Sequence, residues 1–132
     1  MPTAGQKSCV LIVDGSVDSR EVLRTALQLR GVETLEASSA RDGIALTHSH
    51  APDVIILDLE SLDCDGSDSC HDFGDHRGEA SLVVLGTIQR SVAKSPGTEF
   101  VSKPYHYGPL VRRIEGLLQK THREGQSGRE AA

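Results

Sequence analysis

Two continuous apolar runs, each ending in an aspartate, constrain the fold of this chain more than any other feature. The segment CVLIVD spans residues 9–14, and VIILD spans residues 54–58. Uninterrupted apolar runs of this length are typical of strands that are buried on both faces, as in a parallel sheet covered by helices. Asp14 and Asp58 then mark the places where a buried strand reaches solvent.

A helical pattern follows each of the first two strands. Ser16 is suited to cap the first helix. Ser39 and Asp42 resemble a capping box at the start of a second helix over residues 40–49. Gly43 lies inside this second helix and is expected to weaken it by about 1 kcal/mol relative to alanine.

The remaining predicted elements are strands over 32–37, 82–85 and 98–102, short or irregular helices over 67–80 and 88–94, and an amphipathic helix over 110–118. Strands that alternate with helices through short connections predict a doubly wound α/β fold, in which helices cover both faces of a five-stranded parallel sheet. Residues 1–7 are predicted to form an N-terminal extension, residues 8–121 a single domain, and residues 122–132 a disordered tail.

Composition excludes several classes of function. The chain has 14 Lys and Arg against 19 Asp and Glu, a net charge of −5 that argues against direct nucleic-acid binding. No apolar run approaches the roughly 18 residues of a membrane span, and the N-terminus lacks the features of a signal peptide. Cys9, Cys64 and Cys70 form no disulfide framework, which indicates a reduced, cytoplasmic setting.

Chemically useful side chains follow the predicted strands. The carboxyl ends of parallel strands meet at one edge of the sheet, where sites form in open α/β folds. This edge receives Asp14, Asp58, Gly86 with Thr87, and Lys103. Because neighbouring carboxylates repel each other, a bound cation is favoured, and oxygen ligands suit Mg²⁺. A lysine beside them suits a phosphate group.

These segments together resemble the receiver domain of two-component response regulators over residues 8–120. The matching motifs are VLIVDGS at the first strand, VIILDLESLDCDG at the third, VVLGT at the fourth and FVSKPY at the fifth. The resemblance implies a flavodoxin-like sheet in the order 2-1-3-4-5. It also implies phosphoryl transfer from a kinase phosphohistidine to an aspartate, with signalling by altered partner binding.

The resemblance assigns roles to individual residues. Asp58 matches the phosphoacceptor, Lys103 the lysine that contacts the phosphoryl group, and Phe100 the switch aromatic. Mg²⁺ is implied, with ligands from Asp14, Asp58 and the backbone carbonyl of Glu60. The domain is expected to be a signalling protein rather than an enzyme, with at most self-catalysed phosphotransfer and dephosphorylation.

The resemblance also implies partners. A histidine kinase or a histidine phosphotransfer protein is the expected donor, and a downstream protein is the expected receiver of the signal. A homodimer is compatible with the sequence. We expect no output domain after the last predicted helix, so any effect is expected to come through partner binding or a separate chain, without direct contact to nucleic acid or membrane.

Two positions depart from the family pattern. Gly15 replaces the second acid of the acidic pair, which predicts weaker Mg²⁺ binding. Gly86 stands where the family has the switch hydroxyl, and Thr87, one residue later, is a candidate substitute. Both departures keep an alternative open, in which the chain is a pseudo-receiver that binds proteins without being phosphorylated.

Two further functions are weaker alternatives. Cys64, Cys70, His71 and His76 form a zinc-compatible set, although their spacing matches no established zinc pattern. An aspartyl-phosphate phosphatase would also use an aspartate at a strand end together with an acid two residues later, a position that Glu60 occupies. The chain, however, has little material for a cap over a substrate.

Overall fold

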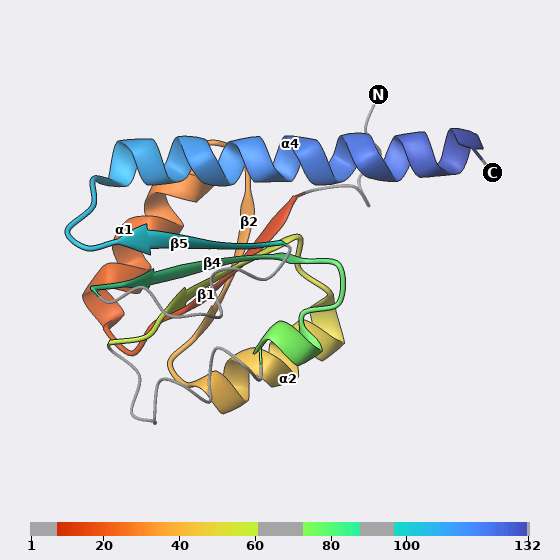
Figure 1. Cartoon of the computed structure of the whole chain (residues 1–132). Coiled ribbons are helices and arrows are strands. Elements are labelled where there is room, and N and C mark those ends of the chain that lie inside the picture. The colour runs from red at the N-terminus through yellow and green to blue at the C-terminus, as the bar shows by residue number, and fades with distance from the viewer. Residues whose placement is uncertain (1–7, 61–72, 88–96, 132) are drawn as a thin grey trace.

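The protein is described by a computed structural model that covers residues 8–60, 73–87 and 97–131, with residues 121–131 described as backbone only. Residues 73–76 are helical and precede the fourth strand. The longer elements, in chain order, are β1 (Cys9–Val13), α1 (Val17–Gln28), β2 (Glu33–Ala37), α2 (Ala40–His50), β3 (Val54–Asp58), β4 (Ser81–Gly86), β5 (Thr98–Ser102) and α4 (Tyr107–Ala131) (Figure 1).

The strands form one parallel sheet in the order β2-β1-β3-β4-β5, which confirms the predicted order. At the centre, β3 pairs with β1 through Val13 and Leu57, and with β4 through Asp58 and Leu85. The chain runs from β1 outward to β2 and then returns across β1 to β3. The strand order therefore reverses between β1 and β3, at the kind of position where open α/β sheets form their sites.

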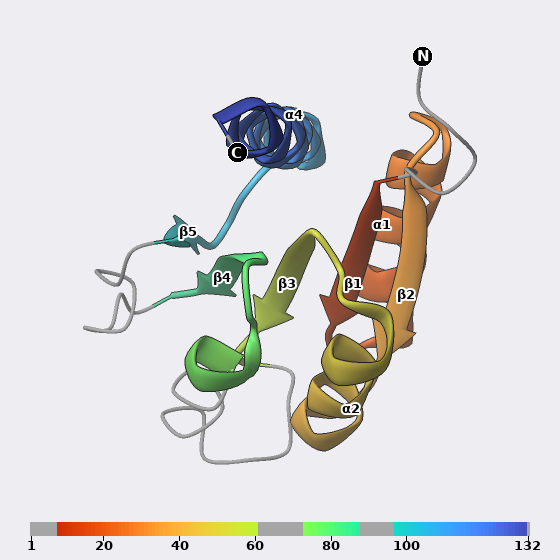
Figure 2. The ribbon, with the colours of Figure 1, turned by 90° about the vertical axis from the view of Figure 1, so that its right-hand side faces the viewer.

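Helices cover both faces of the sheet, as predicted (Figure 2). On one face α1 and α4 pack over a core cluster that includes Ile12, Leu23 and Ile114. On the other face α2 and the helical residues 73–76 pack over a second cluster, which includes Leu57 and Phe73. Because all residues of β3 are buried between these two layers, this strand is a continuous apolar run in the sequence.

Both predicted helix starts are present. The Ser16 hydroxyl accepts a hydrogen bond from the amide of Ser19 at 3.3 Å, and the Ser39 hydroxyl accepts one from the amide of Asp42 at 3.2 Å. Each bond satisfies an amide that has no partner within its own helix. These caps explain why the amino ends of α1 and α2 lie where the sequence placed them.

Gly43 has a packing role that its helix propensity does not reveal. A Cβ atom at this position would lie 2.8 Å from Cζ of Phe73 and 2.8 Å from Cγ2 of Val13. The absence of a side chain therefore lets α2 approach β1 and the helical residues 73–76 closely. Gly43 lowers the helix propensity of α2, as predicted, but it also allows close packing. Alanine at this position would require its neighbours to shift.

The C-terminal helix is longer than its apolar pattern predicts. Its buried apolar residues run from Leu110 to Leu118, whereas α4 begins at Tyr107 and continues to Ala131. It thus passes through a segment for which the composition predicted no regular structure. Extending an existing helix adds one hydrogen bond per residue without a new nucleus. In Figure 1 the end of α4 extends beyond the edge of the sheet.

Some predictions fall outside the described residues. These are the short helix over 88–94, most of the irregular helix over 67–80, and three members of the zinc-compatible set, Cys64, Cys70 and His71. Within the parts of the chain that are described, no helix combines the length and the apolar character needed to cross a membrane.

Candidate functional site

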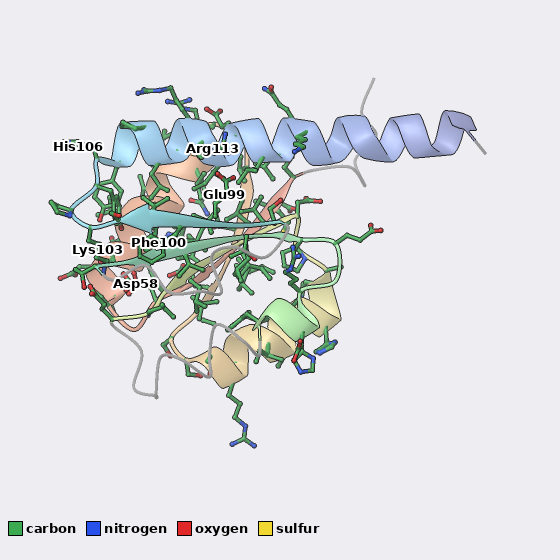
Figure 3. The ribbon with its side chains drawn as sticks, in the orientation of Figure 1. Asp58, Glu99, Phe100, Lys103, His106 and Arg113 are labelled. Carbon is green, nitrogen blue, oxygen red and sulfur yellow. The ribbon has the colours of Figure 1, made fainter. Side chains whose placement is uncertain are left out.

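The site is built at the carboxyl edge of the sheet. Asp58 ends β3, Asp14 follows β1, and Lys103 follows β5. Since Val13 and Leu57 are paired across β1 and β3, the two aspartates that come one residue later lie at adjacent strand ends. Figure 3 shows the side chains of Asp58 and Lys103 side by side at this edge.

Asp58 and Lys103 form a largely buried ion pair. The Lys103 ammonium lies 2.9 Å from Oδ1 and 2.8 Å from Oδ2 of Asp58. The Asp58 side chain is 4% exposed and that of Lys103 is 25% exposed. Partial burial acts to lower the pKa of Lys103, but hydrogen bonds and attraction from Asp58 outweigh it, so the pKa is raised. The charged lysine therefore neutralises a carboxylate that solvent barely reaches.

Both aspartates are oriented by the backbone that follows them. Oδ1 of Asp58 accepts a hydrogen bond from the amide of Glu60 at 3.0 Å, and Oδ1 of Asp14 accepts one from the amide of Ser16 at 2.8 Å. Aspartate commonly bonds the amide two residues later in this way. The two strand ends thus share one local geometry, which fixes where each carboxylate points.

Arg20 holds the turn after β1 and was not identified from the sequence. Its guanidinium donates to the backbone carbonyl of Asp14 at 2.5 Å and pairs with Glu36 on β2 at 3.2 Å. The Arg20 side chain is 13% exposed, so this pair is shielded from solvent more than most surface pairs. Arg20 therefore ties the Asp14 turn to the neighbouring strand.

The side chain of Glu60 links three strand ends. One carboxylate oxygen accepts hydrogen bonds from the backbone amide of Thr87 at 3.0 Å and from its hydroxyl, while the other lies 3.4 Å from the Lys103 ammonium. The bond from the Thr87 hydroxyl is the main reason that the pKa of Glu60 is lowered, and Lys103 adds to the effect. Glu60 is exposed, so these bonds are made at the mouth of the site.

Gly86 and Phe100 lie against each other beside this site. Gly86 is buried at the end of β4, and a Cβ atom there would lie 3.6 Å from Cε2 and Cζ of the Phe100 ring. Phe100 is half-buried and packs against the core cluster on the α2 face. A small side chain at position 86 would therefore contact the ring without a clash.

The oxygen ligands at this edge of the sheet suit Mg²⁺. Asp14 and Asp58 are 1% and 3% exposed, and Mg²⁺ typically takes one or two carboxylates together with water and phosphate oxygens. The backbone amide of Glu60 donates to Asp58, so the Glu60 residue lies beside this carboxylate. Among the described residues, no group of three or more His, Cys, Asp or Glu side chains could hold a metal ion. Mg²⁺ here would therefore depend on backbone, water and phosphate oxygens besides the two aspartates.

His76 is the one member of the zinc-compatible set that the structure describes. Its Nδ1 lies 3.1 Å from Nε2 of His48 on α2, and the two rings are in a T-shaped arrangement. This contact connects α2 to the segment before β4. His48 lies in the last turn of α2 and His76 precedes β4, so this contact lies away from the end of β3 that carries Asp58.

Comparison with known proteins decides the family. The sequence matches the family described as response regulator receiver domain over residues 10–115. The chain belongs to this family. The probable transcriptional regulator ycf27 of Guillardia theta is 29% identical over 122 residues, which cover 89% of this chain and 48% of that protein. The KDP operon transcriptional regulatory protein KdpE of Escherichia coli is 31% identical over 115 residues, which cover 84% of this chain and 51% of that protein.

Solved receiver domains share the fold. The signal receiver domain of a putative LuxO repressor protein from Vibrio parahaemolyticus superposes with a TM-score of 0.79 at 19% identity, covering 92% of this chain and 97% of that one. A CheY-like receiver domain protein from Methanospirillum hungatei gives a TM-score of 0.79 at 18% identity, covering 90% and 99%. The present chain spans about half the length of the curated relatives named above.

Membership of this family sets the general chemistry. Response regulator receiver domains accept a phosphoryl group on an aspartate, generally with bound Mg²⁺. They interact with histidine kinases and with downstream effectors, and they are signalling domains rather than conventional enzymes.

The structure brings most of the predicted site residues to one edge. Asp58 and Lys103 are in contact, and Asp14 lies at the adjacent strand end. Thr87 reaches the same edge, but its hydroxyl bonds to Glu60. The sequence pattern indicated a role for the Glu60 carboxylate only in a phosphatase, and the resemblance to receiver domains assigned a role only to its backbone carbonyl. The signal that could have identified it is an acid two residues after Asp58, at an edge that also receives a lysine.

Proposed function

We propose that Asp58 accepts a phosphoryl group from the phosphohistidine of a histidine kinase or a histidine phosphotransfer protein. The phosphorylated receiver domain then signals through altered binding to a protein partner. The observation that carries this proposal is the contact of the Lys103 ammonium with both oxygens of the buried Asp58, across 45 residues of sequence. A nucleophile and a cation are thereby held at the point where the two strands end.

The proposed step needs little covalent chemistry from the protein. The bond between phosphorus and the donor imidazole breaks, the imidazole leaves with its electron pair, and a bond forms between phosphorus and an Asp58 oxygen. The amide of Glu60 orients the carboxylate, and Lys103 faces the charge of about −1.5 to −2 that the product carries. Positioning and charge neutralisation therefore make up the protein's contribution.

Asp14, Asp58 and the backbone carbonyl of Glu60 are the residues we assign to hold Mg²⁺. When bound, the ion supplies positive charge to the phosphoryl oxygens. Gly15 contributes no carboxylate where the family pattern has a second acid, so we expect weaker Mg²⁺ binding than in receiver domains with both acids. Arg20 supports this ligand set indirectly because it fixes the carbonyl of Asp14.

Two residues are proposed to carry the conformational response. Thr87 is assigned as the substitute for the hydroxyl that is missing at position 86. It is exposed just after β4, so its side chain is not confined by strand geometry. Phe100 is assigned as the switch aromatic because its ring lies against Gly86. Motion of the ring would connect the site to the surface of β5.

A second candidate is a pseudo-receiver that binds protein partners without phosphorylation. Gly15 and Gly86 favour this function, since one removes a metal ligand and the other leaves the end of β4 without a hydroxyl. The Asp58–Lys103 pair would then be a structural feature only. The two candidates differ in a single measurable property, the formation of a phosphoadduct on Asp58.

Mass spectrometry of the intact protein after incubation with acetyl phosphate and Mg²⁺ tests the proposal. We expect a phosphoadduct in the native protein and complete loss of the adduct in Asp58→Asn. Asp53→Asn is the matched control, because it removes a carboxylate from the other end of the same strand and should retain the adduct. If no adduct forms at any concentration of Mg²⁺, the phosphoacceptor proposal is overturned and the pseudo-receiver is the candidate that is left.

A further inference from the structure

The Glu60 carboxylate occupies donors that suit a phosphoryl group. One oxygen accepts hydrogen bonds from the amide and the hydroxyl of Thr87, and the other pairs with the Lys103 ammonium. An ammonium, a backbone N–H and a hydroxyl are also the donors that proteins offer to phosphate oxygens. The exposed Glu60 carboxylate therefore occupies the hydrogen-bond donors that a phosphoryl group would use.

Glu60 is also close to the reacting carboxylate. A single ammonium group separates them, because Lys103 lies 2.8 Å from Asp58 and 3.4 Å from Glu60. A phosphoryl group on Asp58 would bring a charge of about −1.5 to −2 to this place. Like charges around one cation repel each other, so the acid and the phosphoryl group cannot share Lys103 without a penalty.

We propose that the Glu60 carboxylate is an internal competitor of the phosphoryl group: it holds Lys103 and Thr87 in the resting protein and leaves them when Asp58 is phosphorylated. The inference rests on the proposed function of Asp58. Glu60 thereby slows phosphorylation by anionic donors. Its departure frees the Thr87 hydroxyl and amide to bind the phosphoryl group, so that Thr87 takes the part that a hydroxyl at position 86 would otherwise play.

The rate of phosphorylation by acetyl phosphate is the direct test. In this reaction the bond between phosphorus and the acetyl oxygen breaks, acetate leaves with the electron pair, and the bond to Asp58 forms. Glu60→Gln removes the charge while keeping an oxygen that can accept from Thr87. We expect adduct formation to become about threefold to tenfold faster at low ionic strength, since charges at an exposed position are partly screened.

Salt separates a charge effect from a structural one. The native rate should increase with ionic strength as the repulsion is screened, and the difference between native protein and Glu60→Gln should shrink. Glu79→Gln is the matched control, because this exposed residue lies before β4, at the opposite edge of the sheet, and its replacement changes the net charge equally. Its rate should equal that of the native protein at every salt concentration.

Thr87→Val tests the anchor of Glu60. Loss of the hydroxyl should speed phosphorylation less than Glu60→Gln does, because the Thr87 amide still binds the acid. In Glu60→Gln, the further change Thr87→Val should not increase the rate again. A second increase of similar size would show that the two residues act independently, which overturns the inference.

The outcomes distinguish this inference from the proposed function. An adduct on Asp58 that forms at equal rates in native protein and Glu60→Gln at low salt overturns the inference and leaves the proposed function intact. A slower reaction in Glu60→Gln also overturns it, because the acid would then assist the transfer. Absence of the adduct from both proteins overturns the proposed function and the inference together.

Discussion

The two ends of β3 each carry an aspartate, and these aspartates have different partners. Asp53 precedes the strand, is half-buried, and accepts a hydrogen bond from the backbone amide of Cys9 at 2.9 Å. Asp58 ends the strand, is buried, and lies against the Lys103 ammonium. One carboxylate is therefore held by a backbone donor of the adjacent strand, and the other by a cation on a side chain that can rotate.

This difference separates a structural acid from the acid that we propose to be phosphorylated. A backbone amide is fixed by the sheet, so the bond from Cys9 locks the register of β1 and β3 at their amino ends. An ammonium on a flexible stem can follow new negative charge, so Lys103 could stay beside Asp58 under the proposed phosphorylation. The comparison predicts that changes at the two ends of β3 differ in size and in kind.

Loss of Lys103 should have the largest effect on stability. In Lys103→Met the buried Asp58 carboxyl group loses its partner, and we expect the free energy of unfolding to fall by about 2 kcal/mol. Urea denaturation without Mg²⁺ measures this loss. Adding Asp58→Asn to the variant should restore most of it, because the unpaired carboxyl group is then gone. An equal loss in the double variant would mean that Lys103 stabilises the fold by packing alone.

Loss of Asp53 should lower stability less than loss of Lys103 does, and it should leave phosphorylation unchanged. Asp53→Ala removes the acceptor of the Cys9 amide, and we expect a loss of about 1 kcal/mol in the free energy of unfolding. Asp53→Asn should lose less, since an amide oxygen still accepts the bond. Both variants should form the phosphoadduct at the native rate. A reduced rate in Asp53→Asn would contradict the separation between the two ends of β3.

The smallest expected effect is on the Cys9 thiol beside Asp53. Burial, followed by the negative charges of Asp53 and Glu33, raises the pKa of this thiol from 9.0 to about 11. Because the folded protein holds the proton more tightly than the unfolded chain, the thiol's contribution to stability is present below pH 9.0. That contribution is lost as the pH rises through about 11.

Alkylation measures this pKa directly. The rate of reaction of Cys9 with iodoacetamide, in a background of Cys64→Ser and Cys70→Ser, should follow the thiolate fraction and reach its half-maximum near pH 11. Asp53→Asn should shift that midpoint to lower pH, since it removes one of the charges that oppose ionisation. A midpoint that stays unchanged in Asp53→Asn would indicate that the charge of Asp53 does not contribute to the raised pKa.

Much of the fold could be predicted because its signals are local. The apolar run at 54–58 predicts a strand buried on both faces, and Ser16 and Ser39 predict where two helices begin. Short right-handed connections then restrict the sheet to few strand orders, and the resemblance to receiver domains selected one of them. The meeting of Asp58 and Lys103 follows from that order, since both lie at the same edge of the sheet.

The remaining features depend on contacts between distant segments. The hydroxyl of Thr87 could face any polar group at the edge, and only the position of the Glu60 side chain decided its partner. In the sequence Gly43 only lowers helix propensity, whereas in the structure it allows Phe73 and Val13 to pack against α2.

By itself the sequence determined the strands, the helix starts and the edge of the sheet that carries chemistry, because backbone periodicity and capping involve residues a few positions apart. Only the tertiary structure decided that the Asp53 carboxylate accepts a hydrogen bond from the backbone amide of Cys9 on the adjacent strand. It also decided that Glu60 lies over Lys103 and Thr87. Side-chain partners at the ends of strands are set by neighbours that arrive from other strands, and no local pattern in the chain specifies them.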